Sequence, residues 1–538
     1  MRRMVPIENA SMPDRTVIEW DKDDLDALGL LKVDCLALGM LTAIRKALDF
    51  IGLRKGCVFG MQDIPAEDGD TYDMICKADT VGVFQIESRA QMSMLPRLKP
   101  RCFYDLVIEV AIVRPGPIQG GMVHPYLARR QGREPVVYPS EALKEALGRT
   151  LGVPVFQKQV MQISILAAGF TPGEADGLRR SMAAWKRKGG LEHYYSKIVD
   201  GMTSRGYEES FAKAIFEQIK GFSEYGFPES HAASFALLVY ASCWIKCHHP
   251  AEFLAAMLNS QPLGFYSPSQ LVQDARRHAV EVRPVDVMYS DVDCTLEDLH
   301  HEPAVRLGLR MIAGLKASSA DRIVAARSQQ VFDSAEDLAL RARLELHELK
   351  LLAAADALMS LSGHRRQQVW EAAGLHAAPG LLREAPVDED FLALDEAPEG
   401  EEIVFDYAST GLTLRRHPLA LLRERLTLRG LMTAQDLEGI EDGEHVSHCG
   451  IVTLRQQPET AKGTIFLSLE DETGVVQVIV WKSLREVQRQ ELLGARLMVV
   501  HGRWQREGLV KNLIAVRLED LTLLLGRLGA ATMSRDFR

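Results

Sequence analysis

The sequence has few cysteines, no long apolar run and no excess of basic charge, and each shortage excludes a class of protein. Eight scattered cysteines without a CxxC pair argue against a disulfide scaffold and favour a reduced, cytoplasmic protein. The longest apolar run, AASFALLVYASCWI, is too short to span a bilayer, so we expect no membrane partner. The first stretch, MRRMVPIENASMPDRT, lacks the apolar segment of a signal peptide. A net charge of −10 means that nucleic-acid binding would have to use local basic patches.

What the sequence does contain is typical of a globular protein of several domains. Its 538 residues are 47% hydrophobic and 25% charged, enough for roughly three to four domains. A strand, LLKVDCLAL, precedes an amphipathic helix, GMLTAIRKALDFIG, and from about residue 80 to residue 260 the pattern is mostly helical. An acidic stretch rich in Ala and Pro follows near residue 376, and after it short alternating segments predict five or so strands of a small closed barrel such as an OB-fold.

One carboxylate, Asp34, stands alone in the apolar run LGLLKVDCLALGMLTAI. Burying an unpaired carboxylate is costly, so this position needs a partner, a metal ion or an open site. The simpler interpretation is a strand end, where Asp34 caps a turn or pairs with Lys32. These residues alone favour the simpler interpretation.

A basic cluster, LRRSMAAWKRKGG, contains Arg179, Arg180, Lys186, Arg187 and Lys188 without an acid among them. One hypothesis is a phosphate-binding helix face, because guanidinium groups bind phosphate oxygens in pairs. The alternative is a solvated helix face, although such a face usually mixes both signs of charge.

A segment further along, EYGFPESHAASFALLVYASCWIKCHHPAEF, offers two kinds of candidate. Ser230 and His231 follow a Gly-Phe-Pro turn and are placed to face a cleft, while capping of the next helix is the alternative for Ser230. Cys243 and Cys247 are one helical turn apart, as zinc ligands can be, but no second ligand pair follows and core packing is the better interpretation.

Two weaker patterns lie between residues 280 and 330. Asp286, Asp291 and Asp293 in RPVDVMYSDVDCTLED suggest a carboxylate pair for a metal, but a polar turn explains them better. The segment GLKASSADRIV resembles half of a helix-hairpin-helix, whose backbone amides bind a phosphate. It lacks a second hairpin glycine after Gly314.

Taken together, the segments resemble one family over nearly the whole chain, the bacterial C-family DNA polymerases, the group of the DNA polymerase III alpha subunit. NSQPLGFYSPSQLVQDARRHAVEVRPVDV and the closing SRDF resemble the error-prone, damage-induced branch. The main motifs, in the order of the family, are WDKDDLDALGLLKVDCLALGML, TVGVFQIESRAQMSML, VRPGPIQGGMVHPYL, VPVFQKQVMQI, LRRSMAAWKRK and GFPESHAASFALLVYASCWIKCHHPAEF.

The resemblance implies a role for Asp34. In this family a strand ending in Lys-x-Asp carries the third palm carboxylate, and Asp34 matches it. Two Mg²⁺ ions would activate the primer hydroxyl and stabilise the leaving pyrophosphate, and they need several converging carboxylates. Lys32, two residues earlier on the same strand face, would reach the triphosphate.

The resemblance also implies nucleotide-binding and DNA-binding residues. Arg179 and Arg180 match the arginines of the fingers that meet the incoming deoxynucleoside triphosphate. Ser230 and His231 match the pair near its sugar, where side-chain bulk discriminates against a ribose hydroxyl. The matching motifs and the barrel supply the remaining candidates: Arg114 and Lys246 for the nucleotide, and Lys186, Arg187, Lys188 and Arg455 for primer–template DNA.

The implied fold is multidomain α+β. It combines a partial polymerase palm, mostly helical fingers, a helix-hairpin-helix-like region and a C-terminal OB-fold β-barrel that binds single-stranded template. The expected boundaries are palm 1–60, fingers 61–295, helix-hairpin-helix-like region 296–375, acidic linker 376–405, connecting helical segment 406–444 and OB-fold 445–525.

Several features depart from the family pattern. The Pro-Asp-x-Asp motif with the other two palm aspartates is absent, as is the PHP domain, so we expect an N-terminally truncated product that does not catalyse alone. Ser181 replaces the usual Ala and Lys158 the usual acid. Without a convincing clamp-binding pentapeptide, we expect accessory translesion proteins to bring the chain to the sliding clamp. The first hypothesis is therefore a translesion DNA polymerase, and the alternative is a non-catalytic DNA-binding or interaction fragment, or a degenerate remnant.

Overall fold

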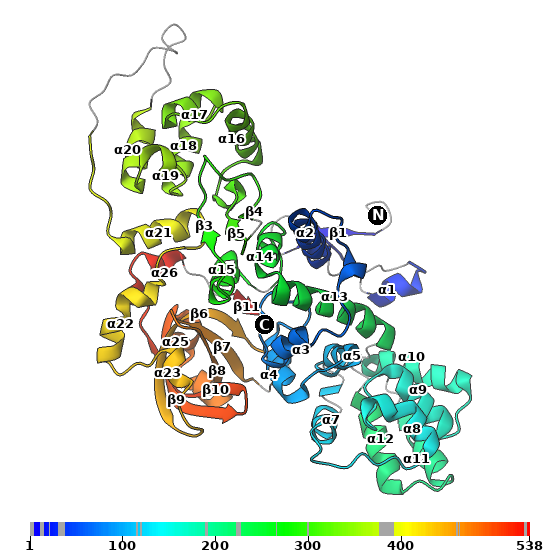
Figure 1. Cartoon of the computed structure of the whole chain (residues 1–538). Coiled ribbons are helices and arrows are strands. Elements are labelled where there is room, and N and C mark those ends of the chain that lie inside the picture. Colours follow the sequence, from blue (N-terminus) through cyan, green and yellow to red (C-terminus); the bar gives the residue numbers. More distant parts are fainter. Residues whose placement is uncertain are drawn as a thin grey trace.

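The structure is a computed structural model of the whole chain, in which four regions follow one another along the sequence (Figure 1). It describes residues 5–10, 16–20, 22–30, 38–114, 117–118, 121–188, 192–221, 228–264, 266–298, 301–375, 392–458, 461, 463–531 and 535–537. The predicted strand that carries Lys32 and Asp34 lies outside these residues. None of the described helices combines the length and the apolar character needed to cross a membrane.

The first region begins with a small hairpin and continues into a large helical body. Strands β1 (Ile7–Asn9) and β2 (Thr16–Ile18) pair antiparallel, and α1 (Lys22–Ala27) follows. The helical body contains α2 (Leu38–Lys55), α3 (Gly69–Cys76), α4 (Arg89–Leu98), α5 (Phe103–Ile112), α7 (Val123–Arg130), α8 (Glu141–Leu147), α9 (Gln157–Leu166), α10 (Pro172–Lys188), α11 (Glu192–Thr203), α12 (Glu209–Gly221), α13 (Glu229–His248), α14 (Pro250–Leu258) and α15 (Pro268–Arg277). The predicted amphipathic helix after residue 38 is therefore confirmed.

Helix α13 is the central element of this body. It packs against α2, α3, α5 and α14, and most of its side chains from Ala232 onward are buried. A helix that is apolar on all sides belongs inside a protein, which explains the long run that the sequence shows here. Cys243 is fully buried, in agreement with the core-packing interpretation of the cysteines.

The second region joins a small sheet to a group of short helices. The sheet has the order β3 (Val282–Arg283), β5 (Ala304–Arg306), β4 (Thr295–Glu297), so its first strand lies before the expected start of this region at residue 296. The helices that follow are α16 (Ala317–Gln329), α17 (Ala335–Arg341), α18 (Leu346–Ala354), α19 (Met359–Ser362) and α20 (Arg365–Gly374).

The acidic stretch ends earlier than the sequence suggests. Helix α21 (Glu399–Ser409) starts inside the expected linker 376–405, and α22 (Pro418–Leu428) and α23 (Ala434–Leu437) follow. Acidic residues stabilise the first turn of a helix, and Glu399, Glu401 and Glu402 occupy that turn. Glu402 is buried and lies 2.9 Å from Arg365 of α20, so this part of the stretch is packed and not solvated.

The last region is a closed five-stranded barrel. Its strands are β6 (His445–Gln456), β7 (Ile465–Glu470), β8 (Val475–Val480), β9 (Leu497–Glu507) and β10 (Val510–Asp520), in the order β6-β7-β8-β10-β9, and β9 closes the barrel on β6. Only β8 and β10 pair in parallel within it. This is the topology of an OB-fold and confirms the expected barrel. Helices α24 (Lys482–Val487), α25 (Arg489–Gly494) and α26 (Leu528–Ala531) and strand β11 (Arg535–Phe537) surround it.

Candidate active site

A cleft of about 890 Å³ brings together two of the predicted nucleotide-binding residues. Arg179 comes from α10 and Ser230 from the first turn of α13, so two motifs separated in the sequence meet on one surface. The cleft is lined by Glu67, Cys102, Phe103, Tyr104, Val107, Arg149, Gln157, Lys158, Met161, Arg179, Pro228, Glu229, Ser230 and Ala233.

Arg179 is an exposed residue of α10 and lines the cleft. Its guanidinium is 2.8 Å from Asp176, one turn earlier on the same helix. The basic cluster is helical, as expected, but the side chains of Arg180, Lys186, Arg187 and Lys188 lie outside the described residues.

The first turn of α13 shows how Ser230 and His231 are presented. Pro228 occupies the N-cap position of α13, so Ser230 does not cap this helix. Both Ser230 and His231 are exposed, and the His231 ring lies 4.2 Å from the ring of Phe235. Of the two, Ser230 contributes to the described lining of the cleft.

The same cleft contains a preorganised cation that the sequence analysis missed. The guanidinium carbon of Arg149 lies 3.6 Å above the Tyr104 ring, and its Nη1 is 3.5 Å from Glu229. The Tyr104 hydroxyl donates a hydrogen bond of 2.8 Å to the same carboxylate. Burial and this hydrogen bond raise the pKa of Tyr104, so the phenol stays protonated. No motif pointed to Arg149, because its partners come from distant segments.

Lys246, also predicted to bind the nucleotide, has a different environment. Its ammonium is buried and lies 2.8 Å from Asp274 and 3.0 Å from Asp79. Burial alone would lower the pKa of Lys246, but the two carboxylates outweigh it and raise the pKa. The Lys246 ammonium is enclosed in the core beside a pocket of only about 10 Å³, and Lys246 is not in the described lining of the cleft of Arg179.

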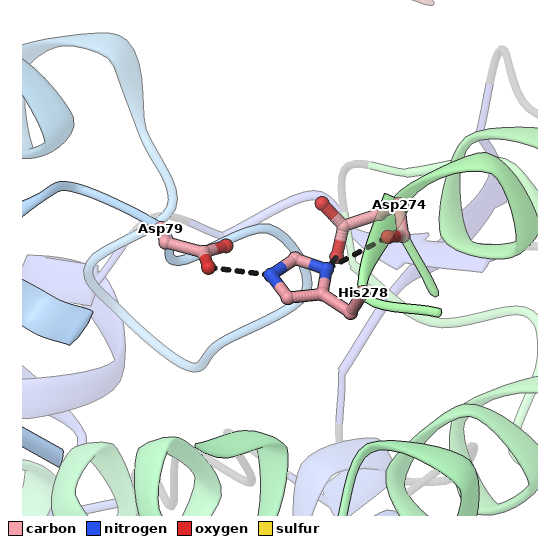
Figure 2. A group of neighbouring side chains, drawn as sticks. All are labelled: Asp79, Asp274 and His278. Carbon is pink, nitrogen blue, oxygen red and sulfur yellow. Dashed lines mark hydrogen bonds and ion pairs between the residues drawn. The ribbon is translucent and has the colours of Figure 1, made fainter. Parts of the chain in front are cut away.

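His278 lies between the same two aspartates, Asp79 and Asp274, as Figure 2 shows. Its Nε2 lies 2.5 Å from Asp79, and its Nδ1 is 2.8 Å from the Asp274 carbonyl oxygen. The hydrogen bond to Asp79 is the main cause of the raised pKa of His278. Burial would raise the pKa of Asp79, but His278 and Lys246 lower it. Asp79, Asp274 and His278 are spaced as metal ligands could be, yet both carboxylates already form ion pairs with Lys246.

Two further predicted residues are held by backbone carbonyl groups. Arg114, just after α5, donates to the Val110 carbonyl at 3.1 Å and to Gln85 at 2.5 Å. Arg455 is buried in the barrel and donates to the carbonyl oxygens of Leu492 (2.8 Å) and Ala495. The burial of Arg455 argues against the predicted contact with DNA.

The three aspartates near residue 290 do not converge on one point. Asp286 is buried and accepts hydrogen bonds from Met288 and Ser360. Asp291 and Asp293 are paired with Arg327 and Arg310, respectively. The turn over residues 287–289 supports the polar-turn interpretation, and the metal alternative finds no support here.

A second cleft, of about 630 Å³, lies between the helical body and the tip of the β9–β10 hairpin. Arg97 spans this boundary and lies 2.7 Å from Glu507 at the end of β9. The cleft is lined by Pro96, Arg97, Leu98, Lys99, Arg130, Gln131, Arg133, Glu507, Gly508 and Leu509. Four cations against one carboxylate make this a basic patch on an acidic protein.

Sequence comparisons agree with this arrangement. The family model described as the bacterial DNA polymerase III alpha subunit finger domain matches residues 40–206. The helix-hairpin-helix motif matches residues 279–368, and the bacterial DNA polymerase III alpha NTPase domain matches residues 1–37. An error-prone DNA polymerase of Methylococcus capsulatus is 56% identical over 99% of this chain, and one of Bordetella bronchiseptica is 59% identical over 100%.

The chain belongs to the bacterial DNA polymerase III alpha family. It is similar to the error-prone members over its whole length, including one of Dechloromonas aromatica at 58% identity. The chain spans about half the length of these relatives, between 52% and 53% of each.

Proposed function

We propose that this member of the polymerase III alpha family is the nucleotide-binding and template-binding part of an error-prone DNA-directed DNA polymerase. The reaction is template-dependent deoxynucleotidyl transfer, with primer–template DNA and deoxynucleoside triphosphates as substrates and translesion synthesis as its setting. The main support is that Arg179 and Ser230, predicted from separate motifs, line one cleft. The names of the relatives point the same way.

The cleft can hold a triphosphate by charge and orient its sugar by shape. Arg179 offers a fork of N–H donors in the lining, and Arg149 adds a second guanidinium, which Tyr104 and Glu229 hold in place. Ser230 lies near the expected sugar position, and His231 of the same helical turn supplies bulk beside it. Arg180 belongs to this set as a prediction from the motif.

The predicted magnesium site depends on Asp34, with Lys32 beside it. The described residues supply no set that fits a pair of Mg²⁺ ions, since both carboxylates of their metal-like group, Asp79, Asp274 and His278, are already paired with Lys246. Asp34 and Mg²⁺ therefore stay predictions, and we derive no step through the ions.

The basic cleft gives the single-stranded template a path beside the barrel. Lys99 and Arg133 are exposed, and the cleft continues to the tip of the β9–β10 hairpin at Gly508 and Leu509. The loop between the last two strands is a common nucleic-acid contact in OB-folds, and phosphate contacts supply most of such affinity. Accessory translesion proteins and the sliding clamp stay predicted partners.

The decisive experiment is primer extension by the purified chain, with Mg²⁺ and all four deoxynucleotides. Arg179→Ala and Asp34→Ala are the test variants. Arg45→Ala is the matched control, because Arg45 is also exposed and paired with an aspartate of its own helix, Asp49. Binding of a labelled primer–template is measured in parallel.

Extension that is lost in both test variants and kept in the control supports the polymerase. If the native chain and all variants bind the primer–template but none of them extends the primer, the result supports the second candidate function, a DNA-binding fragment. Extension that survives in Arg179→Ala would contradict the assigned cleft.

A further inference from the structure

A cavity of about 300 Å³ lies between the OB barrel and the helical body, away from the cleft of Arg179. The two sites share no lining residue among those described. Strands β6, β7 and β8 form one side of the cavity, and α4 and α15 form the other. Its lining is Val81, Glu87, Ser88, Arg89, Met92, Tyr266, Gln270, Asp274, Arg277, Thr453, Leu454, Gln456, Ser468, Glu470, Gly474, Val475 and Gln477.

Arg89 is the unusual member of this lining. Its Nε atom is buried without a hydrogen-bond partner, and no ion pair joins its guanidinium to any residue in the described part of the chain. Burial lowers the pKa of Arg89 to about 10, and no carboxylate opposes the shift. The half-buried guanidinium lines the cavity without an acidic partner among the described residues, so an anion in the cavity would pair with it.

The carboxylates in the lining are already neutralised or engaged. The Asp274 carboxylate accepts a hydrogen bond of 2.8 Å from the Lys246 ammonium. Glu470 is 3.7 Å from Arg277, and burial raises its pKa to about 7. Glu87 also has a partner. None of these groups compensates Arg89.

The N-terminus of α4 lies beside the Arg89 guanidinium and adds a partial positive charge to it. Arg89 is the first residue of this ten-residue helix, and Ser88 is its N-cap. The N-terminus of a helix carries a partial positive charge and favours a phosphate near its first turn. The cavity thus presents a guanidinium and a helix N-terminus together.

We propose that this cavity binds the phosphate monoester of a nucleotide, either a free mononucleotide or the 5′-phosphate end of a strand. The phosphate lies against Arg89 and the start of α4. Met92, Leu454 and Val475 give the base an apolar wall, and the amides of Gln456 and Gln477 offer donors and acceptors to its edge. This second nucleotide site does not rest on the polymerase proposal, so a failure of primer extension leaves it standing.

Calorimetric titration of the full chain tests the site. The probes are deoxyadenosine monophosphate, deoxyadenosine, inorganic phosphate, and a short oligothymidine with and without a 5′-phosphate. Arg89→Met is the test variant, since it keeps the length of the side chain and removes its charge. Arg276→Met is the control, because Arg276 is an exposed arginine of α15 outside the lining.

We expect Arg89→Met to weaken binding of the phosphorylated probe at least about tenfold, and Arg276→Met to leave it unchanged. We expect the probe without its phosphate, or phosphate without its nucleoside, to bind at least about tenfold more weakly. The thermal midpoint of Arg89→Met should not fall, because the charge that is removed is half-buried and has no acidic partner among the described residues. Loss of binding with an unchanged midpoint then excludes misfolding.

The affinities of the mononucleotide and of the 5′-phosphorylated oligothymidine are compared, and the probe that binds more tightly identifies the source of the phosphate. Equal affinity of the native chain and Arg89→Met for every phosphorylated probe would overturn the site. Binding of phosphate as tight as that of the nucleotide would overturn the nucleotide assignment, and so would a failure of all phosphorylated probes to saturate the folded chain.

Discussion

The ammonium of Lys246 lies 2.8 Å from the Asp274 carboxylate inside the helical body. Asp79 lies 3.0 Å from the same nitrogen on another side. These contacts join α13, α15 and the loop after α3, three segments distant in sequence. Breaking a buried ion pair by removing one partner leaves the other charge uncompensated, which costs more than an exposed pair is worth.

Lys246→Met is therefore expected to destabilise the helical body by about 3 kcal/mol, seen as a lower thermal-unfolding midpoint. Lys220→Met is the control, because Lys220 is exposed and pairs with Glu217 of its own helix, and its cost should be below about 0.5 kcal/mol. A Lys246→Met protein with native stability and weak nucleotide binding would instead restore Lys246 as a nucleotide-binding residue.

Replacing His278 by glutamine should give a pH-dependent loss of stability. The folded protein raises the pKa of His278, chiefly through its hydrogen bond to Asp79. The stability from this interaction is present below the unfolded pKa of histidine and is lost as the pH rises through the folded pKa. The midpoint of His278→Gln should thus fall furthest below that of the native chain at about pH 6, and least at about pH 9.

The background titration in this pH range is shared by both proteins. Glu470, whose pKa is about 7, changes charge in the native chain and in the variant alike, so the difference between their midpoints reports His278. Asp79 and Asp274 face the ring and both pair with Lys246. The pKa of Lys246 is raised and that of Asp79 is lowered, so both groups hold their charges between these two pH values. A difference that is constant with pH would mean that His278 is not charged in the folded protein.

The barrel could be predicted because strand alternation is a local signal. Along β8, Val476, Val478 and Val480 are buried while the residues between them are more exposed, as a two-residue period requires. The closure of β9 on β6 follows from the same pattern. The start of α21 was missed, because it depends on Arg365, a distant partner of Glu402.

In the candidate site, too, the sequence predicted some residues and could not predict those that depend on distant partners. Motif resemblance placed Arg179 and Ser230 in one functional set, and both line the cleft. It could not show that Lys246 meets Asp79 and Asp274, because such pairing depends on long-range packing. Nor could it find Arg149, whose charge is fixed by Tyr104 and Glu229 from other segments.

Reversing two charges in the basic cleft should weaken single-stranded DNA binding. The double variant Lys99→Glu with Arg133→Glu removes two cations that would pair with phosphates and adds repulsion. The slope of log affinity against log salt should shrink by about 0.7 for each phosphate that is no longer neutralised. The control is Lys482→Glu with Arg489→Glu, two exposed cations on α24 and α25 that do not line the cleft. An equal decrease in affinity in both double variants would mean that the cleft is not the template path.

Replacing Arg455 by methionine should test whether its role is structural. The buried guanidinium donates to the carbonyls of Leu492 and Ala495 at the end of α25, so its removal leaves these acceptors unpaired. We expect a cost of about 1–3 kcal/mol, measured as a lower unfolding midpoint of the barrel. Single-stranded DNA affinity, measured well below that midpoint, should stay unchanged.

The matched control for this change is Arg517→Met, since Arg517 also lies in the barrel but has a side chain that is 61% exposed. The free energy of unfolding of Arg517→Met should stay within about 0.5 kcal/mol of the native value, so its midpoint should hardly change. Because a DNA contact and a structural contact move different quantities, the two measurements separate them. A normal midpoint for Arg455→Met together with weakened DNA binding would reinstate Arg455 as a template-binding residue, and would require the strand to reach a guanidinium that is buried in this structure.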